Sequence, residues 1–522
     1  MVARTSFGFA FISMGVLALL GVSSAQGCGG GGSGNPFSAG ADSGSDGTRG
    51  AGDGGGMFGE GGGPSGDGSG SGVVCPPGLQ CSVTCPGGTT TTISGKVYDP
   101  ALKNPLYNVA VYVPAAALEP LPKGVPTGAE ACNCGALFKS GAVVSTTTGV
   151  DGSFKLANAP IAAGGGTVPL VLQIGKWRRA IRLKVNQCQD NPQADRSLSL
   201  PATVATGDTA DNMPDIAVST GNADTLECLM HRIGLPASEY VAGAGGAGHV
   251  HVYAGGDPSG GGIGIAGIPE MPGWSGSGTA PVSAVDLWDS QAHLMPYDIT
   301  LLSCEEAETY RANPAALESY LDAGGRVFGS HFHYSWFSGP LDTPQAYSAP
   351  ADWGSHLATW TPGNPNSQTA SGVIDQTLNG SNNPFPKGVA LDAWLGLNGA
   401  LVGGQLPILR VKYNAVVGPA NTPSQPWIID AANKDTLFFS FDTPVNAPAA
   451  PDGGAPAYCG RAVFSDIHVG SASGDTKAPP GGCASVDLSP QEKAMEFMLF
   501  DLSSCVVPDA IPPMGGVPPP PK

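Results

Sequence analysis

Short apolar runs separated by turn residues fill the chain between residues 89 and 204. β-Branched residues are frequent in these runs, and Gly, Pro and Asp stand between them. The predicted strands cover residues 91–98, 109–113, 145–148, 154–156, 168–174 and 180–185. Strands this short and this closely spaced are typical of two packed sheets. The pattern therefore predicts a β-sandwich over residues 89–204.

The pattern changes after residue 205, where apolar strands alternate with helices. The predicted strands cover residues 215–220, 248–253, 297–304, 326–329, 436–441 and 461–465. Strands that alternate with helices indicate a parallel sheet with helices on its faces. Residues 205–507 are therefore predicted to form a three-layer α/β domain with a mainly parallel sheet. The chain as a whole is predicted to be multidomain.

Three predicted helices carry recognisable starting signals. Asp224 and Glu227 form a predicted capping box, and Gly234 ends the helix that follows it. A second helix is predicted to begin at Asn313-Pro314, because Pro is favoured in the first turn. The box Ser489-Pro490-Gln491-Glu492 is predicted to begin a last amphipathic helix.

The beginning of the chain differs from both predicted domains. A positively charged start, an apolar stretch over residues 7–22 and small residues after it predict a signal peptide over residues 1–25. The apolar stretch is shorter than the roughly 20 residues that span a membrane. Two processing routes stay open: cleavage after Ala25, or lipidation of Cys28, whose surroundings resemble those of bacterial lipoproteins. Residues 26–74, rich in Gly and Ser, are predicted to be a disordered tether.

Charge narrows the choice of partners. The 522-residue chain carries a formal charge of −18, with 13% charged residues. No broad basic surface is available to neutralise phosphates, which argues against a nucleic-acid partner. The basic cluster at 176–184 is predicted to be a solvated strand edge; a site for an anionic polysaccharide, lipid headgroups or the acidic tether is the alternative. Residues 75–88 form a Cys-rich segment, and residues 508–522 a Pro-rich tail.

Eleven of the twelve cysteines follow Cys28. Their number predicts disulfides formed in an oxidising compartment, with at least one thiol left over or paired between chains. Cys459 and Cys483 flank one Gly- and Pro-rich excursion and are predicted to pair. Cys132 and Cys134 lie in an insertion of the predicted sandwich and are expected to form local bridges.

Three stretches of the predicted sandwich carry a family resemblance. They are Ser94-Gly95-Lys96-Val97-Tyr98-Asp99, Asn108-Val109-Ala110-Val111 and Thr148-Gly149-Val150-Asp151-Gly152-Ser153-Phe154. These stretches resemble the carboxypeptidase regulatory-like, or transthyretin-like, β-sandwich. The resemblance implies an Ig/transthyretin-like sandwich with a structural or carbohydrate-binding role and no catalytic residues.

The predicted α/β domain carries a second resemblance, at residues 297–302, 320–331 and 460–468. These stretches resemble the class I glutamine amidotransferase-like superfamily and its ThuA-like branch, which implies a flavodoxin-like sheet. Amidotransferases present a cysteine at a Gly-x-Cys-x-Gly elbow, and the same slot here reads Gly329-Ser330-His331-Phe332-His333. A glutaminase is not expected, because the thioester of that reaction needs a thiolate at the elbow.

Polar strand ends supply the candidate chemistry. In parallel α/β sheets, sites form at the carboxyl ends of the strands. Histidines stand at two of these predicted ends, and the candidate catalytic residues are His331, His333 and His468. Cys304 ends another predicted strand. Two following carboxylates would raise the pKa of its thiol, so we expect a buried half-cystine or an inert thiol.

A second histidine group suggests a metal site. His249 and His251 can point to the same face of an extended strand, and Asp466 could complete the set. Imidazole and carboxylate ligands suit Zn, or Fe in an open facial arrangement. Chance pairing of histidines is the alternative explanation.

Two functions stay open from the sequence. The first is an exported binding or structural protein whose amidotransferase-like domain is degenerate. The second is a hydrolase-type or metal-assisted enzyme that acts on a carbohydrate or cell-envelope substrate. In both cases the expected partner is a carbohydrate or an envelope component, and a lipid anchor is the expected membrane contact. The expected location is the cell envelope (lipid-anchored outer membrane or periplasm) or the medium.

Overall fold

The computed structural model describes residues 75–204, 210–221, 223–256, 276–277, 281–342, 346–362, 368–448, 456–469, 475 and 479–512. These residues belong to one compact unit of the chain. The predictions for the signal peptide, Cys28 and the tether lie outside the described residues, as does most of the Pro-rich tail. None of the helices in the described ranges has the length and apolar character that a membrane crossing requires.

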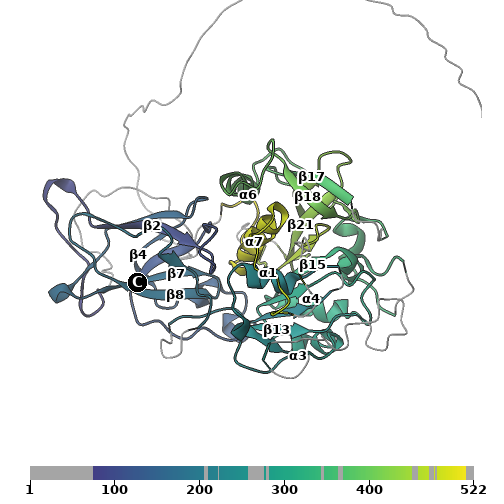
Figure 1. Cartoon of the computed structure of the whole chain (residues 1–522), viewed down its shortest axis with the longest axis horizontal. Helices are drawn as coiled ribbons and strands as arrows, with labels where there is room; N and C mark the ends of the chain where they lie inside the picture. The colour runs from purple at the N-terminus through teal and green to yellow at the C-terminus, as the bar shows by residue number, and fades with distance from the viewer. Residues whose placement is uncertain are drawn as a thin grey trace, which may run out of the picture. The chain divides into compact units, whose positions relative to one another are not determined.

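Two four-stranded sheets, purple to blue in Figure 1, form the first part of the fold, which we call the sandwich. One sheet contains β10 (Leu198–Ser199), β2 (Thr92–Tyr98) and β5 (Ser153–Ala157), with β9 (Asp190–Pro192) also beside β2. The other contains, in order, β4 (Ala142–Thr147), β3 (Ala110–Pro114), β7 (Val168–Ile174) and β8 (Trp177–Leu183). Alternate residues of β5 are buried, and Phe154 and Leu156 share one apolar core with Val111 and Leu170. The alternation therefore turns one face of each strand inward.

Ten strands form a second, larger sheet, teal to yellow-green in Figure 1. Six neighbours run parallel in the order β12 (Tyr240–Ala242), β13 (Val250–Tyr253), β11 (Ile216–Ser219), β14 (Ile299–Leu302), β15 (Arg326–Ser330) and β22 (Gly460–Ser465). Four antiparallel strands follow: β21 (Thr436–Thr443), β20 (Ser424–Asp430), β17 (Gln368–Ile374) and β18 (Leu406–Val411). The parallel strands are buried almost throughout, as expected for a sheet covered on both faces. The predicted sheet-rich chain with several sheets is confirmed in this general form.

Seven α-helices and several short elements complete the described fold. The helices are α1 (Leu226–Arg232), α2 (Val285–Trp288), α3 (Gln291–Leu294), α4 (Pro314–Asp322), α5 (Tyr334–Ser338), α6 (Pro386–Leu397) and α7 (Pro490–Ser503). The 3-10 turns are η1 (Pro86–Gly88), η2 (Gly128–Glu130), η3 (Cys134–Phe138), η4 (Ala163–Gly165), η5 (Ala237–Glu239), η6 (His331–His333) and η7 (Gly354–His356). The small ladders are β1 (Leu79–Gln80) with β6 (Ile161–Ala162), and β16 (Thr359–Trp360) with β19 (Ala415–Val416).

The helix starts agree with the sequence at two positions and differ at one. Helix α7 begins with the predicted capping box of Ser489 and Glu492, and the Asn313 side chain caps α4. Helix α1 begins at Leu226, and the side chain of its N-cap residue, Thr225, forms no capping hydrogen bond. The predicted cap residue, Asp224, instead accepts a hydrogen bond from the Ser330 hydroxyl. Asp224 therefore bonds to Ser330, 106 residues away in sequence, and not to a backbone amide in the first turn of α1.

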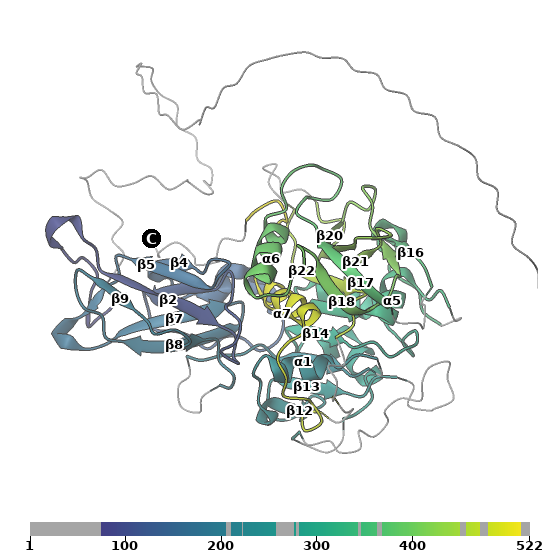
Figure 2. The same ribbon diagram turned by 45° about the horizontal axis from the view of Figure 1, so that its top comes forward.

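Helices α6 and α7 lie between the sandwich and the large sheet (Figures 1 and 2). The Trp394 indole of α6 donates a 2.6 Å hydrogen bond to the Pro105 carbonyl. Trp177 of β8 packs against Phe500 of α7, with ring centroids 5.7 Å apart. Both tryptophans are fully buried, so the sandwich and the α/β part share apolar packing.

Two residues of the basic cluster form part of this contact, whereas Arg182 on the edge strand β8 and Lys184 directly after that strand are exposed. Lys176 and Arg178 are both buried. The Lys176 ammonium pairs with Asp298 at 2.5 Å, and the Arg178 guanidinium donates to the Glu119 and Ala210 carbonyls. The prediction of a solvated strand edge is therefore wrong for these two residues, because other parts of the chain cover them.

Five disulfides connect ten of the eleven described cysteines, and their pairing corrects two predictions. The bonds are Cys75–Cys81, Cys85–Cys188, Cys132–Cys459, Cys134–Cys505 and Cys228–Cys483. Cys459 and Cys483 therefore do not pair with each other. Cys132 and Cys134 form no local bridges either, and both link the sandwich insertion to the α/β part. Spacing along the chain misled both predictions, because the partners are 255 to 371 residues apart.

The large sheet bends back on itself next to the end of β22. Val411, at the end of β18, forms an antiparallel bridge with Ile467. The Lys412 amide donates to the Asp466 carbonyl at 2.8 Å, and the His468 amide donates to the Arg410 carbonyl at 3.1 Å. The last strand of the antiparallel part therefore returns to the carboxyl end of the parallel part.

Candidate functional site: a cysteine–histidine cluster

Three adjacent parallel strands end in chemically active side chains. Cys304 lies two residues after β14, His331 directly follows β15, and His468 lies three residues after β22. Strand β15 pairs with both β14 and β22, so the three carboxyl ends meet at one edge of the sheet. This edge is where open α/β sheets bind their ligands.

The three side chains converge at this edge. Cys304 Sγ lies 3.1 Å from His331 Nδ1, and the rings of His331 and His468 have centroids 5.0 Å apart. One donor atom from each residue lies within 4.8 Å of the other two. This group of three is the single cluster of its kind found among the described residues, and we call it the CHH cluster.

The backbone at His331 is held in an uncommon conformation. Its φ of 44° lies in the left-handed region, where strand β15 turns into η6. A non-glycine residue in this region is strained, and such strain occurs most often at functional sites. The turn brings the His331 ring beside Cys304.

Burial leaves the CHH cluster without the hydrogen bonds that its nitrogens need. The three residues are at most 1% exposed. Both ring nitrogens of His468 and the Nε2 of His331 have no hydrogen-bond partner among the described residues. Each unsatisfied buried group costs about 1–3 kcal/mol.

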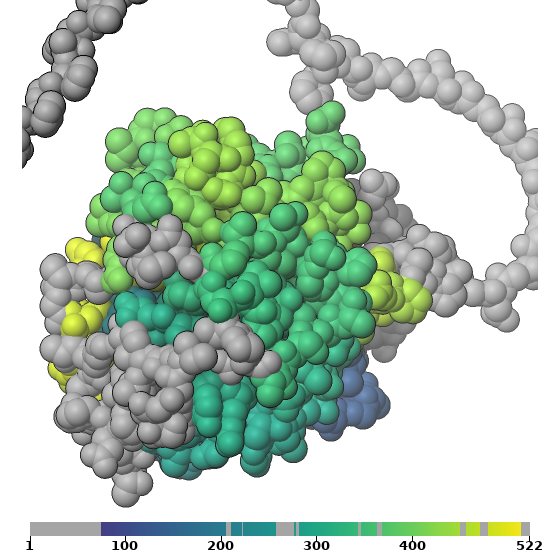
Figure 3. Space-filling view, turned by 90° about the vertical axis from the view of Figure 1, so that its right-hand side faces the viewer, coloured from purple at the N-terminus to yellow at the C-terminus, as the bar shows by residue number. Residues whose placement is uncertain are grey.

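Figure 3 shows one face of the α/β part, whose described surface is formed mostly by the green segments from the middle of the chain.

Protonation at the CHH cluster follows from the same burial. Burial, with Arg410 and Lys412 nearby, lowers the pKa of His468 to about 3. Burial, followed by the His468 and Lys412 charges, also holds the pKa of His331 well below its usual range. Both imidazoles are therefore neutral and have lone pairs available for a ligand. Burial and then Asp224 raise the pKa of the Cys304 thiol, so that a bound cation would be needed to remove its proton.

The donor set fits a four-coordinate transition metal. Zn–S bonds of about 2.3 Å and Zn–N bonds of about 2.0–2.1 Å place tetrahedral donors roughly 3.5 Å apart. The 3.1 Å contact of Cys304 with His331 is close to that separation. Three protein ligands would leave a fourth position for water or substrate, as in catalytic zinc sites.

Two carboxyl groups stand next to the CHH cluster. Asp224 accepts the Ser330 hydroxyl, and burial raises the pKa of Asp224 to about 7. Burial raises the pKa of Glu305 to about 8, and its Oε1 lies 4.0 Å from the Nε2 of His333. Among the described residues, neither the Oε1 of Glu305 nor the Nε2 of His333 has a hydrogen-bond partner.

The structure brings together two of the three predicted catalytic histidines, His331 and His468. His333 is buried nearby, but its Nδ1 donates to the Ser330 carbonyl and it is not part of the cluster. Cys304 was expected to be a buried half-cystine or an inert thiol. It is indeed a free, buried thiol with a raised pKa, but it contacts His331 directly. Its position at the end of a strand next to that of His331 is the signal that could have identified it.

The other predicted metal ligands lie apart, which corrects that prediction. His251 belongs to β13 and Asp466 follows β22, with β11, β14 and β15 between these two strands. At about 4.8 Å per strand, the two residues are roughly 19 Å apart across the sheet. His249 precedes β13 and its Nδ1 lies 2.6 Å from Glu239, while the His251 Nδ1 lies 2.8 Å from the Gly243 carbonyl. These residues therefore cannot share one ion.

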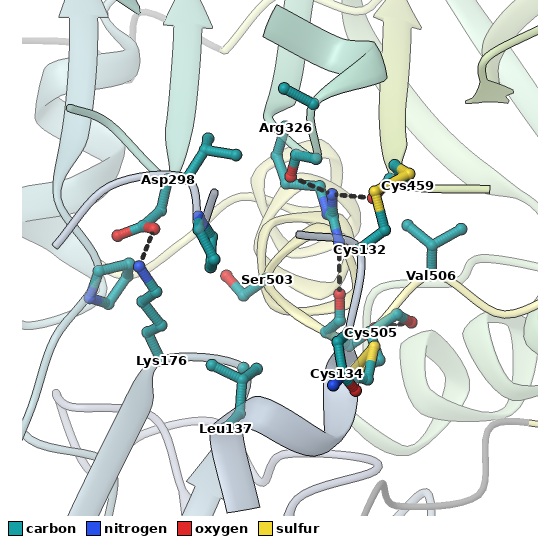
Figure 4. Close-up of a pocket in the computed structure, with 18 of the residues that line it drawn as sticks. Cys132, Cys134, Leu137, Lys176, Asp298, Arg326, Cys459, Ser503, Cys505 and Val506 are labelled. Atoms are coloured by element: carbon teal, nitrogen blue, oxygen red, sulfur yellow. Dashed lines mark hydrogen bonds and ion pairs between the residues drawn. A yellow bond between two sulfur atoms is a disulfide. The ribbon is translucent and has the colours of Figure 1, made fainter. Parts of the chain in front are cut away.

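A cavity at the opposite edge of the sheet has a different character. It measures about 110 Å³ and lies where the sandwich insertion meets the starts of β14 and β15 (Figure 4). Lys176 pairs there with Asp298. The Arg326 guanidinium donates to the Gly324 and Cys459 carbonyls. The charged groups of this wall are thus bonded within the protein, and we place the candidate site at the CHH cluster.

Comparison with known proteins adds no relative. A scan of the chain against models of protein families finds no match, and a search of curated proteins finds no significant similarity. The CHH cluster is therefore interpreted from its own geometry.

Proposed function

We propose that this protein is a metal-dependent enzyme of the hydrolase type whose ion is held by Cys304, His331 and His468. The observation that carries the proposal is the state of His468. Its imidazole is buried, neither of its nitrogens has a hydrogen-bond partner in the part of the chain that the structure describes, and a second imidazole and a thiol lie within ligand distance. A metal–nitrogen bond would remove the cost of burying an unpaired nitrogen.

Zinc fits this donor set best. Sulfur and imidazole nitrogen are its usual ligands, and sites with three protein ligands keep one position open. When bound there, a zinc ion supplies a hydroxide near neutral pH and polarises a substrate oxygen. The open iron sites of oxygenases use two histidines and a carboxylate, whereas the third donor here is a thiol.

The residues of the chain hold and prepare the ligands. The left-handed turn at His331 orients its ring, and the Ser330–Asp224 hydrogen bond ties the end of β15 to the segment after β11. Neutral His331 and His468 can bind a cation without first losing a proton. The surrounding side chains exclude bulk water, which strengthens every electrostatic interaction at the site.

The family resemblances enter this proposal as expectations. The sandwich is proposed to be transthyretin-like, and the α/β part amidotransferase-like with a metal site in place of the elbow cysteine. Five disulfides among the described cysteines support a function outside the reducing cytoplasm. We place the enzyme in the cell envelope, anchored through Cys28, or in the medium, with a carbohydrate or envelope component as substrate.

A second candidate function is binding without catalysis. The observation that favours it is the burial of Cys304, His331 and His468. In that case the ion would be structural, and the protein would serve as an exported binding or structural component.

Metal analysis tests the proposal. The full chain is purified without chelators, incubated with zinc, desalted and analysed by mass spectrometry of its metal content. We expect about one zinc per chain, and a loss of most of that zinc in Cys304→Ser and in His468→Ala. The matched control is His293→Ala, whose side chain is largely exposed on α3.

The outcomes separate the two candidates. A zinc-free wild type, or variants that keep their zinc, would refute the metal site. Retention of all five disulfides, measured by mass spectrometry, shows that the variants fold. Stoichiometric zinc without hydrolysis of model esters, phosphoesters or glycosides would favour the binding function.

A further inference from the structure

A second group of polar side chains lies at the carboxyl edge of the large sheet, beside the CHH cluster. Ser219 ends β11, Glu305 lies three residues after β14, and His333 ends the η6 turn that follows β15. Strand β14 pairs with both β11 and β15, so the three side chains come from adjacent strand ends. We call these three residues the SEH group.

Each residue of the SEH group holds one buried polar atom that lacks a hydrogen bond. The three residues are at most 5% exposed. No described residue forms a hydrogen bond with Ser219 Oγ, Glu305 Oε1 or His333 Nε2. Buried polar atoms are rarely left in this state, because their lost bonds to water are not replaced. The group therefore needs a partner from outside the described chain.

The three atoms lie close to one another. Glu305 Oε1 is 4.0 Å from His333 Nε2. This separation is too long for a direct hydrogen bond, but one donor atom at about 2.8 Å from each of them can bond to both. A β-carbon on Gly255, two residues after β13, would lie 3.0 Å from Glu305 Oε1 and 2.9 Å from Ser219 Oγ. The three atoms thus gather around the Glu305 carboxyl.

Other bonds hold the Glu305 and His333 side chains in place. The Glu305 carboxyl accepts hydrogen bonds from the Gly256 amide and the Thr309 hydroxyl. The Trp336 indole donates in turn to the Thr309 hydroxyl at 2.9 Å. His333 is fixed through its Nδ1, which lies 3.1 Å from the Ser330 carbonyl. The remaining atoms, Oε1 and Nε2, are therefore oriented before any ligand binds.

The chemistry of these atoms selects the partner. A neutral imidazole that donates from Nδ1 accepts at Nε2, and a carboxylate oxygen only accepts. The one ion-pair contact of Glu305 within the described ranges is the contact with His333. A buried carboxylate is costly unless a cation compensates it. An ammonium group supplies that positive charge together with three donors, whereas a hydroxyl group supplies one donor and no charge.

From this geometry we infer that the SEH group binds an amino group of the substrate, as an ammonium held between Glu305 and His333. The inference rests on the proposed function and names its substrate class, because Glu305 directly follows the ligand Cys304 and His333 lies two residues after His331. The amine-bearing substrate would be held at the edge where the metal binds. The overall charge of −18 attracts such a cation at long range.

Ligand-observed NMR of the full chain with propylamine tests the inference, at about pH 7 where an alkylamine is protonated. 1-Propanol is the neutral probe of matched size, and wild type is expected to bind it about tenfold more weakly than propylamine. Glu305→Gln keeps the shape of the side chain and removes its charge, so it should weaken propylamine binding about tenfold or more. The matched control is Glu119→Gln, at an exposed position, which should bind as wild type does.

Both the zinc-loaded and the zinc-free chain are titrated, because an amine that binds the metal directly would not respond to Glu305→Gln. Wild type that binds neither probe at about 50 mM would overturn the inference, show that water alone occupies the SEH group, and leave the metal site intact. 1-Propanol binding as tight as that of propylamine would overturn the inference as well. So would equal propylamine affinities in wild type and Glu305→Gln.

Failure of the proposed function gives a different result. If wild type takes up no zinc, the proposed function fails, and titration of the zinc-free chain still decides whether the SEH group binds the amine. If Glu305→Gln does not form its five disulfides, Ser219→Ala replaces it and should weaken propylamine binding about threefold. The comparison of the two probes on wild type needs no variant and decides the inference by itself.

Discussion

The two edges of the large sheet bury charged and polar groups in opposite ways. At the amino edge, Lys176 and Asp298 form an ion pair, and the guanidinium of Arg326 is surrounded by carbonyls. At the carboxyl edge, both nitrogens of His468 are buried, and no described residue forms a hydrogen bond with either of them. Buried polar groups whose hydrogen bonds are all formed within the protein specify its structure. Buried polar groups without such bonds point to a catalytic role or to a bound ion or water. The comparison gives the amino edge a structural role, and under our proposal the unpaired nitrogens at the carboxyl edge mark the ligand-binding site.

The largest effect is expected from breaking the ion pair at the amino edge. Lys176→Met leaves the Asp298 carboxylate buried without its cation, which should lower the free energy of unfolding by about 3–5 kcal/mol. Denaturant unfolding measures this loss, and zinc content should not change. The double variant Lys176→Met/Asp298→Asn should recover much of the stability. A large loss of zinc in the single variant, at a temperature where it is folded, would contradict the separation of the two edges.

Removal of an interdomain disulfide should have the next largest effect. Cys132→Ser/Cys459→Ser opens a bond between residues 327 positions apart and should cost about 2–5 kcal/mol. The cost comes mainly from the extra freedom of the unfolded chain, and thermal or denaturant unfolding measures it. Cys75→Ser/Cys81→Ser, which opens a six-residue separation, is the matched comparison and should cost less. Equal losses in the two double variants would contradict this explanation.

Zinc should stabilise the protein from the carboxyl edge. At a free zinc concentration of about 100 times the dissociation constant, binding to the folded state should add about 2.7 kcal/mol. Thermal unfolding with and without a chelator measures the difference as a change in Tm. The change should disappear in His468→Ala and persist in His293→Ala. A chelator effect of equal size in both variants would show that the zinc acts elsewhere.

The smallest effect concerns a buried acid pair between the sandwich and α7. Burial raises the pKa values of both Asp99 and Glu496, and Asn104 donates to Glu496 at 2.7 Å. Since the folded state holds its proton to higher pH than the unfolded chain, the free energy of unfolding should fall as pH rises above about 4. Glu496→Gln should reduce this fall by about 1 kcal/mol between about pH 5 and about pH 8.

Denaturant unfolding of Glu496→Gln at several pH values checks the prediction for the acid pair. Glu119→Gln, at an exposed position, is the control and should leave the pH dependence as in wild type. A pH dependence that is unchanged in Glu496→Gln would show that the pair is ionised in the folded state.

Much of the local structure could be predicted from residue order. The short apolar run at residues 154–156, after the turn residues Asp151-Gly152, predicted a strand, and the Ser489–Glu492 box predicted the start of α7. His331 and His468 were candidates because polar residues followed apolar strands. Each of these signals involves residues a few positions apart, and the geometry of a strand or of a helix start brings such residues together.

The remaining features depended on contacts between distant residues. Asp224 does not cap α1 as predicted, because Ser330 lies beside it in the fold and donates a hydrogen bond to its carboxylate. The pKa of the Cys304 thiol was expected to rise because of its sequence neighbours, but burial and then the distant Asp224 are the main causes of the rise. Arg410 and Lys412 were not candidates at all, since the bend of β18 toward Asp466 and His468 has no local signal.

The sequence by itself determined the β-rich and α/β segments, the capped starts of α4 and α7, and the polar strand ends. The tertiary structure alone decided which strand ends meet, which cysteines pair and which histidines share a site. The physical reason is range: hydrophobic period and capping act between residues a few positions apart. Strand order and disulfide pairing depend on the packing of the whole chain, as the 327-residue separation of Cys132 and Cys459 illustrates.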